Sequence, residues 1–183
     1  MKKVIVCVFV CMLLIITLFP ITAMAGDEQN PEIKDKRFDM IKHANIISVW
    51  FYEDSNNPDF LYVSFKLRDL INRTQILETI YVIDWGYNDN NYAATFHVFS
   101  YGVSEFISGK TTINGNDYET YVLCNGIFDI DNDIITWIIP KDAIGDPHPG
   151  DLLTKPFAST HLRFPFNINL PHCDLFKDLS WNA

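Results

Sequence analysis

The fold is decided by residues 80–99, IYVIDWGYNDNNYAATFHVF. Two runs rich in β-branched and aromatic residues, 80–85 and 92–99, flank a turn of Gly, Asn and Asp at 86–91. Branched and aromatic side chains favour the pleated surface of a sheet, whereas Gly, Asn and Asp favour turns. The stretch therefore predicts a β-hairpin.

Similar short runs continue on both sides of this hairpin, and helical periodicity is almost absent. The run at 60–67 alternates, with Leu61, Val63 and Phe65 on one side and Ser64 on the other. The remaining runs are 46–52, 118–123, 134–139 and 157–164. Such spacing predicts an all-β fold: an antiparallel two-sheet β-sandwich of jelly-roll or immunoglobulin-like type.

One short helical turn is expected near residues 140–145. Pro140 suits its start and Gly145 its end, because proline is pre-set for the first helical position and glycine for the residue that follows a helix.

The first 25 residues have the pattern of a secretory signal peptide. Lys2 and Lys3 precede an apolar run, and Ala23-Met24-Ala25 offers a small-residue cleavage site. The alternative is an uncleaved membrane anchor, which Pro20 and the cleavage site disfavour. Residues 26–183 would then form the mature protein, either secreted into the extracellular space or held at the cell surface, without a later membrane span.

Four segments are expected in the chain. Residues 1–25 are the signal peptide, 26–44 a polar N-terminal leader, 45–165 the β-sandwich domain and 166–183 a C-terminal tail. The chain has 14 Lys and Arg residues against 23 Asp and Glu, a net charge of −9, and loss of the two signal-peptide lysines makes the mature protein more acidic. An acidic surface repels nucleic acid, so nucleic-acid binding is not expected.

Two cysteines, Cys124 and Cys173, remain after signal cleavage. Outside the cytoplasm such a pair can form one disulfide that closes a loop of about 50 residues, while two separate thiols are the alternative. Asn72-Arg73-Thr74 is a candidate N-glycosylation sequon at Asn72.

Residues 133–153, DIITWIIPKDAIGDPHPGDLL, carry a resemblance to a known kind of module. Together with the runs at 46–51, 61–64 and 81–94, the stretch resembles a secreted archaeal β-sandwich module found beside subtilisin-like proteases and surface-repeat proteins. The resemblance covers most of residues 45–165 and implies a structural module without a reaction centre. It differs at the end, since similar modules often continue into another aromatic-rich strand.

Asp129, Asp131 and Asp133 stand at every second position, and together they could bind Ca²⁺ through carboxylate oxygens. The spacing fails as an EF-hand loop, because Ile134 stands where glycine is needed and Pro140 where glutamate is needed. A plain Asp-Asn turn between two strands is the alternative. Calcium is the only cofactor for which the sequence offers ligands.

Trp85, Tyr87 and Trp137 are the aromatic candidates for a ligand platform, with Asp84 nearby to bind hydroxyl groups. The favoured alternative is that these rings fill the sandwich core. The five histidines show no metal-ligand spacing.

The sequence contains no nucleophile elbow, zinc-protease motif or phosphate loop. We therefore expect a non-enzymatic module that binds an extracellular polymer such as carbohydrate, or a surface protein. The alternatives are a structural or accessory domain that supports an extracellular partner such as a protease, and a small hydrolase. Exposed aromatic rings would favour the first reading, whereas buried tryptophans would favour the second.

Overall fold

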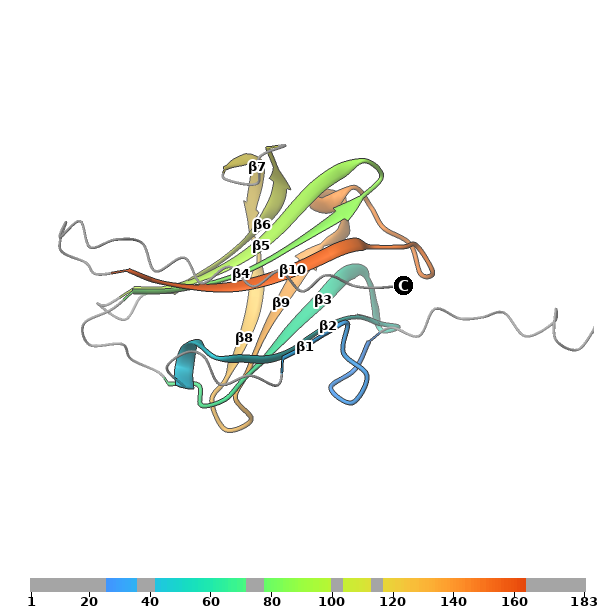
Figure 1. The fold of residues 1–183 in the computed structure, drawn as a ribbon. Helices are drawn as coiled ribbons and strands as arrows, with labels where there is room; N and C mark the ends of the chain where they lie inside the picture. Colours follow the sequence, from blue (N-terminus) through green and yellow to red (C-terminus); the bar gives the residue numbers. More distant parts are fainter. Residues whose placement is uncertain (1–25, 36–41, 72–77, 100–103, 113–116, 164–183) are drawn as a thin grey trace, which may run out of the picture.

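A computed structural model describes residues 26–35, 42–71, 78–99, 104–112 and 117–163. In these residues two antiparallel five-stranded sheets pack face to face, as Figure 1 shows. The first sheet has the order β1-β2-β3-β9-β8 and the second β10-β4-β5-β6-β7. The prediction of an all-β two-sheet sandwich is confirmed.

Strands β2, β3, β4, β5, β7, β9 and β10 each contain a predicted run, whereas β1 and β8 were not predicted. The first sheet comprises β1 (Ile33–Lys34), β2 (Ile46–Asp54), β3 (Asn57–Leu67), β8 (Asn125–Asp129) and β9 (Ile134–Pro140). The second comprises β4 (Glu78–Tyr87), β5 (Asn90–Val98), β6 (Ser104–Thr111), β7 (Tyr118–Leu123) and β10 (Thr154–Arg163). Two 3₁₀ turns, η1 (Lys42–Ala44) and η2 (Lys141–Ile144), complete the described elements.

The decisive hairpin forms as predicted from strands β4 and β5. Ile83 pairs with Ala94 and Trp85 with Tyr92, and the tight turn places Asn88 and Asp89 at positive φ. Every second residue of β4 is buried, so one face of the strand packs in the core and the other faces outward. The predicted helical turn is also present as η2, and Gly145 ends it at φ 84°.

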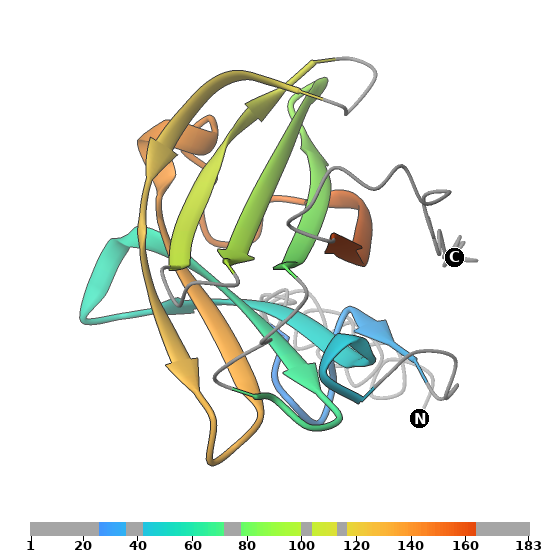
Figure 2. The ribbon, with the colours of Figure 1, turned by 90° about the vertical axis from the view of Figure 1, so that its left-hand side faces the viewer.

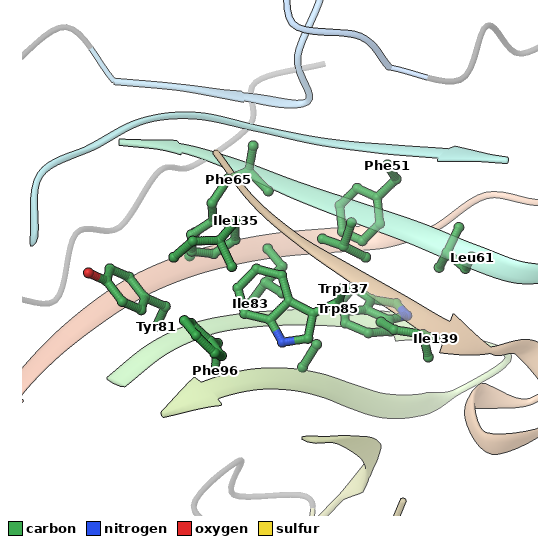
Figure 3. Close-up of a cluster of buried hydrophobic side chains, with 14 of the residues drawn as sticks. Phe51, Leu61, Phe65, Tyr81, Ile83, Trp85, Phe96, Ile135, Trp137 and Ile139 are labelled. Carbon is green, nitrogen blue, oxygen red and sulfur yellow. The ribbon is translucent and has the colours of Figure 1, made fainter. Parts of the chain in front are cut away.

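The core lies between the two sheets and is built largely from aromatic rings (Figure 3). Trp137 of β9 is fully buried and packs edge-on against Phe65, with ring centroids 5.0 Å apart, and against Phe106 at 5.8 Å. Trp85 of β4 packs against Phe51 of β2 at 5.6 Å. The large rings therefore join the sheets across the sandwich.

The N-terminal segment differs from the predicted leader. Strand β1 extends the first sheet through the pairing of Ile33 with Val49, and Ile33 is buried in the core. The domain therefore includes part of residues 26–44. Two strand residues are too few to show alternation in a sequence, which is why the composition of this segment indicated only a polar leader. The predicted tail at 166–183 lies outside the described residues.

The chain crosses from the second sheet to the first between β7 and β8. Cys124 still bonds to the second sheet, since its N–H donates to the Phe106 carbonyl at 3.0 Å, while Asn125 already pairs with Ile138. Figure 2 shows β7 and β8 as one continuous band along this side of the sandwich. Gly126 has no side chain to collide with the Phe106 ring, which lies 2.3 Å from the position of a Cβ.

Candidate functional site

The predicted aromatic platform does not form on the surface. Trp85 and Trp137 are 2% and 0% exposed, and Tyr87 is buried at 8%. Trp50 is buried at 7%, although it lies on the other face of β2 from the core residues Val49 and Phe51. The tryptophans of the described residues are therefore too little exposed to stack on a sugar ring.

The three aspartates of the candidate calcium site do not converge on one point. Both carboxylate oxygens of Asp129 accept hydrogen bonds from Asn132, and these bonds lower the pKa of Asp129. Asp133 instead turns to Leu70, whose N–H donates to its carboxylate at 2.7 Å. No group of three potential His, Cys, Asp or Glu ligands comes together among the described residues. The segment is the Asp-Asn turn between β8 and β9.

Cys124 is half-buried and forms no disulfide with another described residue. Burial raises the pKa of this thiol to about 12, so it stays protonated at neutral pH and is a poor nucleophile. Cys173 and Asn72 lie outside the described residues, and the disulfide and the glycosylation remain predictions.

Polar contacts hold η2 and the loop that follows it. Lys141 is buried, and its Nζ lies 2.9 Å from Glu53 Oε1. Further along, Tyr87 Oη donates to Asp151 Oδ2 at 2.7 Å and the His148 N–H donates to the same oxygen at 2.8 Å. The backbone donor and the tyrosine hydroxyl together lower the pKa of Asp151. These contacts fix the path of the chain into β10, and Tyr87 therefore has a structural role.

Four of the seven exposed large apolar side chains in the described part of the chain lie on β7 and β8. Tyr121 is 63% exposed, Leu123 70% and Ile127 53%. They belong to residues 120–128, TYVLCNGIF, a run without a charged residue in a strongly acidic chain. Sequence reasoning assigned strand structure to its first half and missed the surface. The uncharged run was the signal that could have indicated it.

Among the described strands, β7 is an edge of the second sheet, with β6 as its one neighbour. Residues of an antiparallel pair bond to their partner strand at alternate positions. The Cys124 N–H donates to the Phe106 carbonyl, and Val122, two residues earlier, stands opposite Ser108 in the same register. The backbone N–H and C=O groups of Cys124 and Val122 therefore point toward β6. The N–H and C=O groups of Tyr121 and Leu123 then point away from the sheet.

A hollow of about 310 Å³ lies between this edge and η2. Thr120, Tyr121 and Val122 line it from β7, and Asp142 and Ala143 line it from η2. Asp142 is exposed and supplies a negative charge at the rim. The β7 edge, meaning residues 120–123 with this hollow, thus offers unpaired backbone groups, apolar side chains and one carboxylate.

Comparison with known protein families, curated protein sequences and solved structures found no match. The resemblance to the archaeal surface module remains a prediction. In the described part of the chain, no helix has the length and apolar character needed to span a membrane.

Proposed function

We propose that this protein is a secreted, non-enzymatic module that binds a partner protein by adding an extended segment of that partner to strand β7. The observation that carries the proposal is the β7 edge, whose outward backbone groups have no partner strand among the described residues and whose residues 120–123 are uncharged. In strand addition, main-chain hydrogen bonds supply affinity and side-chain pockets supply specificity. Both elements are present along residues 120–123.

The partner segment is expected to be extended and apolar, with a basic side chain for the hollow. Tyr121 and Leu123 would contact its apolar residues. The Asp142 carboxylate favours a lysine or arginine there, and the net charge of −9 favours basic flanking residues. The burial of the tryptophans in the described residues disfavours a polysaccharide ligand and also suits a structural domain. The free edge of β7 is the feature that favours a partner protein.

The function can be tested with peptides selected by phage display on the secreted protein. Binding of the enriched peptides would be measured by fluorescence anisotropy against the wild type and Tyr121→Pro. Proline removes the outward N–H donor of Tyr121 and leaves the bonds to β6 in place. We expect the peptides to bind Tyr121→Pro with a Kd at least about tenfold higher than for the wild type, a loss of about 1.4 kcal/mol of binding free energy.

The matched control is Leu152→Lys. Leu152 is 78% exposed and lies in the loop before β10, so it has a similar apolar exposure away from the β7 edge. Its substitution should leave peptide binding unchanged. Peptides that bind Tyr121→Pro as tightly as the wild type would contradict the proposal. Saturable retention on an insoluble polysaccharide, with no selected peptides, would restore carbohydrate as the ligand.

A further inference from the structure

The residue expected to become the N-terminus, Gly26, lies buried beside the carboxylate of Glu32. A turn brings the two together: Asp27 Oδ1 accepts hydrogen bonds from the N–H groups of Gln29 at 2.8 Å and Asn30 at 2.7 Å. The Gly26 N–H donates to the Glu32 carboxylate. The fit is close, because a Cβ on Gly26 would lie 2.1 and 2.3 Å from the two carboxylate oxygens.

Glu32 is held in place at the first sheet. The N–H of Phe51, a buried residue of β2, donates to Glu32 Oε2 at 3.0 Å. Burial raises the pKa of Glu32, and the N–H groups of Glu32 itself, Phe51 and Gly26 offset part of that rise. No lysine or arginine acts on this carboxylate among the described residues. A partly buried carboxylate without a cation is costly to keep ionised.

We propose that signal-peptide cleavage supplies the missing cation: the new α-ammonium group of Gly26 forms an ion pair with Glu32 and fastens the N-terminus to the first sheet. The inference rests on the predicted cleavage site and is independent of the proposed function.

The step requires a signal peptidase and water. Hydroxide from water adds to the Ala25 carbonyl carbon as the bond to the Gly26 nitrogen breaks, and the nitrogen takes the remaining hydrogen. At neutral pH the Ala25 carboxyl group releases a proton, and the Gly26 amine gains one. The ammonium group has three N–H donors, whereas the amide in the uncleaved chain has one.

Two consequences follow for the processed protein. The ion pair forms only after cleavage, so processing itself stabilises the fold. In addition, a larger first residue would require the Glu32 carboxylate to shift, because a Cβ at this position would lie 2.1 and 2.3 Å from its oxygens.

The experiment uses the full chain, secreted by a bacterial host that removes the signal peptide, with intact mass used to identify the N-terminus. 2-Pyridinecarboxaldehyde, which reacts with free α-amines, then reports on the accessibility of the N-terminus. We expect the wild type to be labelled at least about tenfold more slowly than Glu32→Gln. The matched control is Glu28→Gln, since Glu28 is an exposed acid of the same segment paired with Lys66 at 3.5 Å; it should be labelled as slowly as the wild type.

Thermal unfolding gives a second readout. Pairing with Glu32 raises the pKa of the Gly26 amine above its ordinary value of about 7.7–8.0. The stabilisation from this ion pair is therefore complete at pH values just below about 7.5, where the Gly26 amine is fully protonated. It is lost as pH rises through the raised pKa of that amine in the folded state. At pH 7 we expect Glu32→Gln to lower Tm by about 4 °C, and this difference should shrink toward pH 10.

The labelling rate of the wild type can also be compared with that of a free peptide of residues 26–30. This comparison keeps the test decisive if Glu32→Gln fails to fold. An N-terminus other than Gly26, or a wild-type rate equal to that of the peptide, would overturn the proposal.

Discussion

Strands β7 and β10 are the two edges of the same sheet among the described strands, yet they differ in the residues that would prevent pairing with another strand. Strand β10 begins with a register shift between Thr154 and Phe157 that contains Pro156 and Lys155, the latter at φ 50°. Bulges, proline and lysine are features by which natural sheets prevent edge-to-edge pairing. Strand β7 also begins with a register shift, which contains the charged residue Glu119. Residues 120–123 that follow contain neither proline nor a charged residue, and their side chains are exposed on both faces.

The edges of the first sheet are also restricted. Strand β1 has only two residues, and β8 has five, with glycine at its second position and aspartate at its end. Short edges offer little backbone for pairing. The comparison therefore singles out β7 as the edge on which pairing is not discouraged. This difference in protection is the basis of the proposal that β7 contacts a partner.

The largest expected effect tests the direction of the β7 backbone groups. Val122→Pro should lower the free energy of unfolding by at least about 2 kcal/mol, because it removes an N–H that bonds to β6 and leaves a carbonyl of β6 without its donor. Tyr121→Pro should lower the free energy of unfolding by less than about 1 kcal/mol, because the Tyr121 N–H points away from β6. Urea unfolding followed by tryptophan fluorescence measures both values. Equal losses would mean that β7 has no free edge of the kind described.

The second test exchanges the protection of the two edges. Unprotected edges pair with one another at high protein concentration, so Tyr121→Lys with Leu123→Lys should weaken self-association by about tenfold, or about 1.4 kcal/mol. Lys155→Asn with Pro156→Val should strengthen self-association through β10. Sedimentation velocity across a concentration series reports both changes. The comparison fails if the β7 lysines have no effect while the β10 substitutions do.

The third test concerns β4, the strand beside β10, and an effect of similar size. Asp84 lies opposite Phe157, and burial raises its pKa to about 6. The folded protein thus holds this proton to a higher pH than the unfolded chain, whose aspartates titrate near pH 3.9. Stability is lost as pH rises from about 4 to about 6 and stays lower above that range.

Asp84→Asn removes this loss, so it should stabilise the protein at pH 7 by about 1–2 kcal/mol and change little at pH 4. Unfolding in urea at both pH values provides the measurement. Equal effects at pH 4 and pH 7 would show that ionisation of Asp84 is not the cause.

The sequence predicted the strands well wherever alternation and turn residues coincide. The hairpin of β4 and β5, the strand at 118–123 and the turn ending at Gly145 were all readable from local chemistry. Strand β8 was missed because Asn125 and Gly126 have the composition of a turn. In the structure this glycine instead gives Phe106 room where the chain changes sheets.

The candidate sites were harder to predict than the strands. Tryptophan and tyrosine serve equally well in a core and in a ligand platform, and only the packing of the two sheets decides between these roles for Trp85 and Trp137. Whether an edge is free depends on strand order, which is a property of long-range pairing. The contact between Gly26 and Glu32 likewise depends on a turn and on β2, and no local pattern indicates it.

The pairing of β3 with β9 has a consequence for the order of folding. Strands β4 to β7 pair in sequence order as a local meander. In contrast, β3 can complete its pairing only with β9, and β4 only with β10, both of which come much later in the chain. A chain that emerges from its N-terminus can form the early hairpins at once, but β3 keeps an open side until the last third of the chain arrives. Such non-local pairing slows folding and leaves hydrophobic strands transiently unpaired. Strands β9 and β10 therefore complete the two sheets last. A chain interrupted before residue 134 would lack both strands and leave β3 and β4 each without one partner strand.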